Sequence, residues 1–211
     1  LADASGGGLS KRFGALSIAG LREAGIEPHA LVSYLSRIGT SRPIAPVGGV
    51  AEAAAELDFS AFGRATAKFD TAELERLNAL IVQTLDHAQV ADRLPSVDAD
   101  LWAALRANLT KVADAEDWRA AIDGPTAPMI AEDDREMLAV ASETLPQEPW
   151  DRDTWGAWTA AVKAATGRKG KALFMPLRKA LTGREAGPEI GPLLPRIGRI
   201  KALARLSGQE K

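Results

Sequence analysis

Apolar residues recur every three or four positions along most of the chain, which is the period of one face of an α-helix. No stretch alternates between polar and apolar residues for long enough to predict a strand. The pattern therefore predicts an all-α chain of roughly nine or ten helices. The stretches that carry the helical period are 15–24, 28–38, 50–57, 70–93, 98–112, 114–122, 133–145, 153–165, 171–181 and 196–206.

Several residues indicate where these helices begin and end. Asp70-Thr71-Ala72-Glu73 has the spacing of a capping box, so we expect a long helix that begins there and runs to about Arg93, before Pro95. We expect Asp153 to cap the helix that follows it. Pro176 lies inside a helical pattern, where it must either kink the helix or start a new one.

Two further stretches show how the chain is organised. Pro146 and Pro149 lie close together in LPQEPWD, which predicts a link between domains. Phe59, Phe62 and Phe69 lie within a short stretch between helices, and we expect the three rings to pack locally.

Charge is distributed unevenly along the sequence. Residues 1–153 carry 14 Lys and Arg against 25 Asp and Glu, whereas residues 154–211 carry 12 against 3. A cationic helical segment is typical of a surface that binds a polyanion, most often RNA or DNA, although basic runs are also common on solvated helix faces. Within it, residues 154–184 contain no acid and seven basic residues: Lys163, Arg168, Lys169, Lys171, Arg178, Lys179 and Arg184.

Composition excludes several classes of site. The chain has 211 residues, no cysteine and two histidines, His29 and His87, which are far apart in sequence. Disulfides and thiol chemistry are therefore impossible, and neither a metal site nor a Ser-His-Asp triad is predicted. No apolar run approaches the roughly 20 residues of a membrane span, and no signal peptide is visible, so we expect a cytoplasmic protein without membrane contact. The opening residues, LADASGGG, suggest a piece of a longer chain.

Three segments together resemble the C-terminal portion of bacterial-type glutamyl-tRNA synthetases, which are class I aminoacyl-tRNA synthetases. They are SKRFGALSI, FDTAELERLNALI and GRKGKALFMPLRKALTGREAGPEIGPLLPRIGR, and they occur in order over nearly the whole chain. The resemblance implies a multi-helix stem-contact region followed by two helical anticodon-binding domains. The implied boundaries are 1–68 for the signature loop and stem-contact domain, 69–146 for the first anticodon-binding domain and 147–211 for the second.

The resemblance also implies what the chain lacks. Ser10, Lys11 and Arg12 stand where the family has its ATP-contacting signature loop, with Gly8 in place of the first lysine. The other class I signature, a His-Ile-Gly-His type motif, is not in the sequence. We therefore expect no catalytic residue, catalysis or cofactor for this chain alone. The parent enzyme would join glutamate to tRNA using ATP and Mg²⁺, and its N-terminal catalytic domain would be the missing partner.

By the same resemblance, the partner is tRNA-Glu, and the protein is expected to be a monomer. The implied anticodon-binding residues are Arg178, Lys111, Thr110, Gly187 and Ile190, and the implied tRNA backbone contacts are Arg168, Lys169, Lys171 and Lys179. The five tryptophans are more often core or interface residues than platforms for base stacking. A helical module that binds protein without RNA specificity is the alternative, and the effect of salt on RNA binding separates the two.

Overall fold

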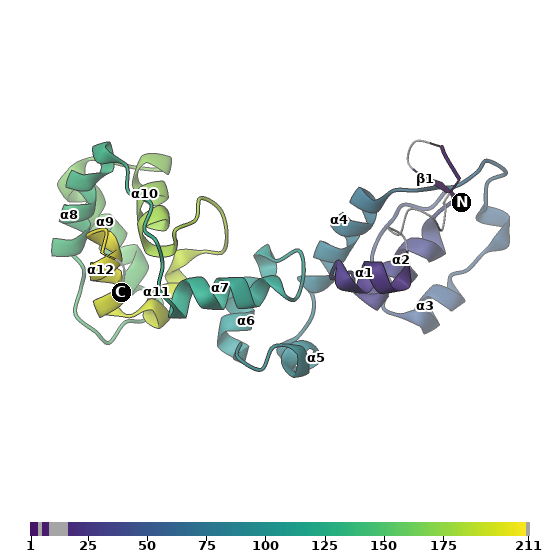
Figure 1. Ribbon diagram of the computed structural model, residues 1–211, viewed down its shortest axis with the longest axis horizontal. Coiled ribbons are helices and arrows are strands. Elements are labelled where there is room, and N and C mark those ends of the chain that lie inside the picture. Colours follow the sequence, from purple (N-terminus) through teal and green to yellow (C-terminus); the bar gives the residue numbers. More distant parts are fainter. Residues whose placement is uncertain (4–5, 9–16, 210–211) are drawn as a thin grey trace. The chain divides into compact units, whose positions relative to one another are not determined.

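The computed structural model describes residues 1–3, 6–8 and 17–209 (Figure 1). Twelve α-helices, short 3₁₀ turns and two strands of two residues each make up the regular structure of these residues. The prediction of an all-α chain is thus confirmed. The chain divides into two compact units: residues 1–94 with 106–115 form the first, and residues 95–105 with 116–211 form the second.

The first unit contains five helices, three 3₁₀ turns and the two short strands. The helices are α1 (Ile18–Glu23), α2 (Pro28–Arg37), α3 (Val50–Ala55), α4 (Thr71–Val82) and α5 (His87–Val90), and the 3₁₀ turns are η2 (Phe59–Ala61), η3 (Ala91–Arg93) and η4 (Arg106–Asn108). β1 (Ala2–Asp3) and β2 (Lys68–Phe69) pair in parallel, with Ala2 opposite Lys68. Its main packing contact joins α2 to α4.

The core of the first unit forms around Tyr34, whose side chain is fully buried. Its ring meets Phe69 edge to face with 5.1 Å between the ring centroids, and its hydroxyl accepts a hydrogen bond from the backbone N–H of Asp70 at 2.8 Å. The prediction that Phe69 packs with Phe59 and Phe62 is therefore wrong. Those two rings stack on each other at 6.2 Å, and Phe59 remains 81% exposed.

Asn78 on α4 joins three segments that are distant in sequence. Its side-chain oxygen accepts a hydrogen bond from the N–H of Glu27 at 2.7 Å. Its amide nitrogen donates to the carbonyls of Thr110 at 2.8 Å and Gly25 at 3.2 Å. Asn78 is buried, and these bonds satisfy both its side-chain amide and the backbone groups of Gly25, Glu27 and Thr110. They help to place residues 106–115 in the first unit.

The long helix expected over 70–93 is shorter than predicted. Asp70 caps it as expected, because its carboxylate accepts hydrogen bonds from the backbone N–H groups of Ala72 and Glu73, but α4 ends at Val82. A new start signal follows, in which Asp86 and Gln89 form a capping box at the beginning of α5. The second start was not predicted, because two short helices whose apolar residues follow the same period give the same sequence pattern as one long helix.

The second unit contains the remaining helices. They are α6 (Ala99–Leu105), α7 (Asp114–Asp123, of which the first two residues group with the first unit), α8 (Arg135–Glu143), α9 (Thr154–Thr166), α10 (Lys171–Thr182), α11 (Ile190–Ile197) and α12 (Arg199–Leu206), with the 3₁₀ turn η5 (Glu132–Asp134) before α8. α8 packs against α9 and α12, and α12 also packs against α10. α11 contacts α9, α12 and α6.

Prolines interrupt the second unit less than the sequence suggests. α10 runs through Pro176, whose missing N–H leaves the Ala172 carbonyl without its helical donor. The guanidinium of Arg168 lies 3.5 Å from that carbonyl oxygen and supplies a donor. α11 likewise contains Pro195 and ends at Ile197. The last helix, expected over 196–206, begins three residues later as α12, and α11 before it was not predicted.

Two helix starts in this unit differ in detail from expectation. Gly198, with φ 75°, separates α11 from α12, since this backbone conformation is open mainly to glycine. The helix expected to be capped by Asp153 is capped instead by Asp151. The Asp151 carboxylate accepts hydrogen bonds from the N–H groups of Asp153 at 3.0 Å and Thr154 at 2.9 Å. These bonds, led by those from Thr154, hold the pKa of Asp151 below its usual value.

The LPQEPWD segment lies inside the second unit and is held by hydrogen bonds. The indole N–H of Trp150 donates to the Pro146 carbonyl at 3.1 Å, and the Arg199 side chain donates to the same oxygen at 3.2 Å. The Glu148 carboxylate accepts the N–H of Arg199 at 3.0 Å. Grouping by contacts does not test the functional division into 1–68, 69–146 and 147–211, which stays a prediction.

Arg205 on α12 is the most deeply buried cation of the second unit that the structure describes, with 2% of its surface exposed. Its guanidinium donates to the carbonyls of Leu181 at 2.7 Å, Gly124 at 2.8 Å and Ile122 at 3.1 Å. These acceptors lie at the C-terminal ends of α10 and α7, where carbonyls lack helical partners and the helix dipole is negative. Burial lowers the pKa of Arg205 below its usual value.

Arg196 on α11 forms a second anchor through ion pairs. Its guanidinium contacts both carboxylate oxygens of Asp123, at 3.0 and 3.1 Å, and also pairs with Asp98. Asp98 in turn accepts the N–H of Leu101 at 2.8 Å and so caps α6. The interaction therefore joins the start of α6, the end of α7 and α11. The hydrogen bonds that Arg196 donates to the Asp123 carboxylate are the main reason that the pKa of Arg196 is raised.

Replacing Arg205 by methionine should destabilise the second unit. The three carbonyl oxygens would remain buried without donors, so we expect a loss of about 3–5 kcal/mol in the free energy of unfolding. Urea unfolding followed by tryptophan fluorescence measures it, because all five tryptophans lie in this unit. Arg152→Met, which alters an exposed arginine, is the matched control and should change the free energy by less than about 0.5 kcal/mol. Equal stability of the two variants would contradict the role given to Arg205.

Replacing Asp98 by asparagine should destabilise the protein in a pH-dependent way. The hydrogen bond from Arg196, followed by that from the Leu101 N–H, lowers the pKa of Asp98 in the folded state. A lowered pKa contributes stability that is complete above the unfolded-state pKa and is lost as pH falls through the folded-state pKa. The difference between the urea midpoints of wild type and Asp98→Asn should therefore be largest near neutral pH and shrink below about pH 4. Asp100→Asn, at an exposed site on α6, should show no such trend.

Candidate nucleic-acid interface

Three of the predicted anticodon-binding residues lie in or beside the loop between α10 and α11: Arg178 on α10, Gly187 in the loop and Ile190 at the start of α11. Arg178 projects from α10 and donates a hydrogen bond to the carbonyl of Pro188 at 2.8 Å. Its side chain is half-buried, and this burial lowers its pKa below the usual value. One edge of the guanidinium therefore fixes the loop, and Arg178 is an anchor of this site as well as a candidate contact.

Gly187 is required by the close approach of this loop to α7. A Cβ atom at this position would lie 2.0 Å from the Trp118 ring, and φ is 144°. A larger residue would force the loop away from the indole. Ile190 begins α11 and is 3% exposed, so its side chain belongs to the core and is not available at the surface.

Arg184 completes this cluster, although it is not among the site residues predicted from the sequence. Its guanidinium carbon lies 4.4 Å from the centroid of the Trp118 ring, and it donates to the Asp117 carbonyl at 3.0 Å. Trp118 is thus covered by Arg184 and the Gly187 backbone and is only 6% exposed. The only signal in the sequence was the position of Arg184 at the end of the acid-free stretch.

Thr110 and Lys111 belong to the first unit, whereas the residues described above belong to the second. The Thr110 hydroxyl and the Lys111 N–H both donate to the Asp114 carboxylate at 2.9 Å, which fixes the turn before α7. The methylene groups of Lys111 lie against Gly25, and the side chain is half-buried. The turn thus presents a lysine whose stem is held by packing and whose backbone is held by Asp114.

The four predicted backbone contacts fall into two classes. Arg168 pairs with the Asp134 carboxylate and donates to the Asp133 carbonyl, which ties the loop before α10 to the start of α8. Lys179 forms an ion pair with Glu185 at 2.6 Å, and this lysine is the main reason that the pKa of Glu185 is lowered. Lys169 and Lys171 are exposed. Only the last two are available for a ligand without breaking an internal interaction.

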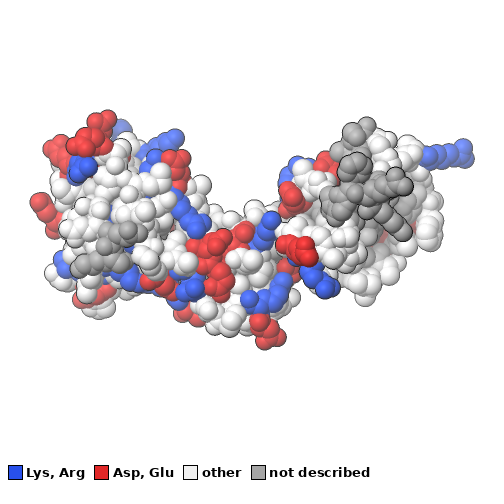
Figure 2. Space-filling model, viewed as in Figure 1, with Lys and Arg blue, Asp and Glu red and all other residues white. Residues whose placement is uncertain are grey.

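Much of the positive charge of residues 154–211 is used inside the second unit. The arginines of residues 154–211 bind acidic side chains or backbone carbonyls. Figure 2 accordingly shows basic and acidic side chains interspersed on the visible face. Within the described residues, the cations of this segment that lack a hydrogen-bond or ion-pair partner are Lys163, Lys169 and Lys171.

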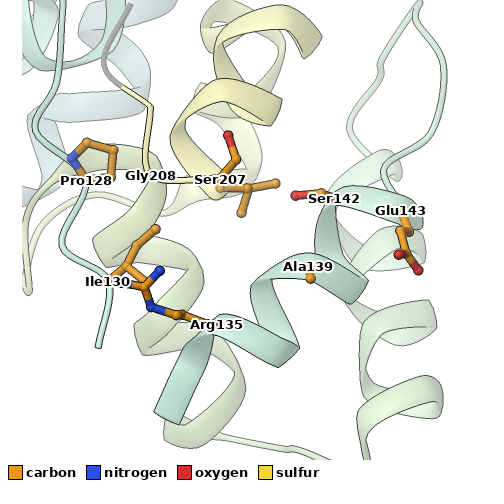
Figure 3. A pocket seen from close by; sticks show the side chains of 9 residues that line it. Pro128, Ile130, Arg135, Ala139, Ser142, Glu143, Ser207 and Gly208 are labelled. Carbon is orange, nitrogen blue, oxygen red and sulfur yellow. The ribbon is translucent and has the colours of Figure 1, made fainter. Parts of the chain in front are cut away.

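A pocket of about 650 Å³ lies elsewhere in the second unit (Figure 3). It is bounded by α8, the end of α12 and the segment around Pro128 and Ile130, with Arg135 and Glu143 among its lining residues. The described residues that line it include none of the predicted site residues. It therefore supports no role in the predicted function.

The remaining expectations concern the signature loop, metal binding and membrane contact. Ser10, Lys11 and Arg12 lie outside the described residues. Among those that are described, His, Asp and Glu form no group of three or more that could hold a metal ion. No helix of the described chain combines the length and the apolar character needed to cross a membrane.

Comparisons with known proteins agree with the resemblance seen in the sequence. "Glutamate--tRNA ligase 2" of Sphingopyxis alaskensis is 53% identical over 203 residues, which cover 95% of this chain and 46% of that protein. "Glutamate--tRNA ligase 1" of Rhodospirillum rubrum is 50% identical over 207 residues, covering 98% of this chain and 47% of that protein. The chain thus spans a little under half the length of these curated relatives.

Solved structures show the same fold. The crystal structure of a glutamate-tRNA synthetase from Elizabethkingia anophelis matches 98% of this chain and 48% of that chain with a TM-score of 0.75, at 18% identity. A family model described as an anticodon binding domain matches residues 99–209, which is more than half of the sequence. This chain therefore belongs to the anticodon binding domain family.

Proposed function

We propose that this chain binds tRNA and that its second unit reads the anticodon loop of a glutamate tRNA. The observation that carries the proposal is the match of residues 99–209 to the anticodon binding domain, since it includes Arg178 and the loop that Arg178 holds. The choice of a glutamate tRNA is supported by the relatives at 53% and 50% identity, which are named glutamate-tRNA ligases.

The proposed mechanism of recognition uses a preorganised loop. Sequence-specific RNA binding targets unstacked loop bases, which offer hydrogen-bonding edges to the protein. Arg178 presents a planar fork of five donors, one of which is committed to Pro188. Because that bond and the contact between Gly187 and Trp118 fix the loop, little ordering is required when RNA binds, and Lys169 and Lys171 can contact phosphates.

The first unit supplies the remaining proposed contacts. Lys111 would meet the third anticodon base as a point charge, with Thr110 beside it, and residues 1–68 would contact the stem of the tRNA. The turn that carries Lys111 is set by Asp114, and Asn78 binds the Thr110 carbonyl from the other side. These bonds support a fixed position for the lysine stem within its own unit.

The ligase activity is proposed for the whole protein, of which this chain would form the tRNA-binding part. In that protein ATP and Mg²⁺ would activate glutamate, and Ser10, Lys11 and Arg12 would contact ATP. The chain alone would bind tRNA without joining glutamate to it. We further propose that it acts in the cytoplasm as a monomer.

Titration with the labelled anticodon stem-loop of tRNA-Glu tests this function. Binding should be tighter for the native anticodon than for loops with substituted second and third anticodon bases, by roughly 1–3 kcal/mol per base. Affinity should also fall steeply with added salt, because phosphate contacts release counterions. Weak binding that changes neither with the anticodon sequence nor with added salt would contradict the proposal and favour a protein-interaction module.

Two substitutions should separate base reading from backbone contact. Arg178→Ala should weaken binding of the native stem-loop by roughly 1–3 kcal/mol and reduce the preference for the native anticodon. Lys169→Glu should weaken binding of all loop sequences to a similar extent and lower the salt dependence. Near-ultraviolet circular dichroism serves as the control for the loop held by Arg178. Unchanged affinity of Arg178→Ala would remove this residue from the site, and altered base preference in Lys169→Glu would contradict its assignment.

A further inference from the structure

One face of α10 carries an exposed aromatic residue between two cations. Lys171, Phe174 and Arg178 are spaced three and four residues apart, so they lie along the same side of the helix. Phe174 is 45% exposed, whereas Leu173 and Leu177 on the inner side are almost completely buried. An aromatic ring that the core does not use is thus placed beside the proposed base-reading arginine.

The Phe174 ring is supported from within the second unit. Its centroid lies 6.3 Å from that of Trp155, with 36° between the ring planes. Trp155 in turn meets Trp158 edge to face at 5.5 Å, and Trp158 is buried and donates its indole N–H to the Ala141 carbonyl at 2.9 Å. Phe174 is therefore backed by a fixed aromatic cluster while nearly half of its surface remains open.

This aromatic surface continues toward the loop held by Arg178. Gly191, in the first turn of α11, lies so close to Trp155 that an added Cβ would be 3.3 Å from its ring. α11 begins two residues after Pro188, the acceptor of the Arg178 hydrogen bond. Phe174, Trp155 and the start of α11 thus form one neighbourhood with the proposed anticodon site.

The charges beside the ring favour a polyanion. Lys169 and Lys171 are exposed, and neither forms a hydrogen bond or an ion pair through its side chain within the described chain. Lys171 makes a small contribution to the lowered pKa of Glu185, whose ion-pair partner is Lys179. An exposed aromatic ring with Lys171 one helical turn away and Lys169 just before the same helix matches the chemistry of a nucleotide, which offers an aromatic base and a phosphate.

We propose that Phe174 is a stacking platform for one unpaired nucleotide base of the bound RNA, with Lys169 and Lys171 contacting the adjoining phosphates. The inference rests on the proposed function and adds a residue to it. Because every base has an aromatic face, the stack supplies affinity and holds the strand in place without selecting the base. Selection stays with hydrogen-bonding groups such as Arg178.

Phe174→Leu tests the stack, since leucine keeps apolar bulk but removes the aromatic face. The probes are the tRNA-Glu anticodon stem-loop and a set of the same stem-loops with a single abasic loop nucleotide. Affinity for the intact stem-loop should fall about tenfold, within the range for one stacked base. With the abasic nucleotide at the stacked position, wild type and Phe174→Leu should bind equally. A 2-aminopurine at that position should be quenched by wild type more strongly than by the variant.

Two further variants exclude indirect effects. Phe174→Tyr retains an aromatic face and should bind within about twofold of wild type. Ile200→Ala shortens another exposed apolar side chain of the second unit, 76% exposed on α12, and should leave RNA affinity unchanged. Tryptophan fluorescence in urea shows that each variant remains folded.

The outcomes separate this inference from the proposed function. If wild type binds with anticodon preference and Phe174→Leu binds equally well, the stack is wrong and the function stands. If the loss in Phe174→Leu persists at every abasic position, the ring acts through the fold and the stack is again wrong. If wild type fails to bind the stem-loop at low salt, the proposed function fails and the stack fails with it.

Discussion

The second unit depends on a cation placed where water cannot reach it. Arg205 brings its charge into the interior, which is costly unless all its donors are satisfied, and it meets carbonyls at the C-terminal ends of α7 and α10. Those two ends lead into the segments that matter for binding. The chain leaves α10 at Gly183 for the loop held by Arg178, and α7 supplies the Trp118 ring on which that loop rests. The position of the candidate site therefore follows from the packing of α12, although α12 contributes no predicted contact.

Arginine and lysine divide the positive charge of residues 154–211 between structure and surface. Arg168, Arg196 and Arg205 use their planar forks to bind carboxylates or carbonyls within the unit. The cations left exposed without partners in the described segment are lysines, whose strongly hydrated ammonium groups favour the surface. The net positive charge of residues 154–211 therefore gave too large an estimate of the basic surface that this segment exposes. The acids that offset it, such as Asp98, Asp123 and Asp134, come from the acidic part of the chain.

Local signals allowed most helices to be predicted, and interactions across the sequence explain the remainder. The apolar period located the helix cores, and Asp70 marked a true start because its cap depends only on the next three residues. The end of α4, the break at Gly198 and the grouping of residues 106–115 with 1–94 were missed. Each depends on geometry that periodicity does not encode, including the hydrogen bond from Asn78 to the Thr110 carbonyl. For the site, the resemblance selected Arg178 and Gly187. The hydrogen bond from Arg178 to the Pro188 carbonyl and the close approach of Gly187 to Trp118 depend on the three-dimensional fold and have no signal in the sequence.

The aromatic residues show why a binding surface is harder to predict than a core. Trp102, Trp118 and Trp158 are buried, in agreement with the expectation that tryptophans serve the interior. Phe174 was not selected from the sequence, because it lies beside Leu173 in an apolar run and reads as one more core position. A single step along a helix turns the side chain by about 100°, so neighbouring apolar residues can face opposite environments. The segment KALFMPL therefore contains both the leucines that hold α10 in the core and an exposed phenylalanine that is open to a ligand.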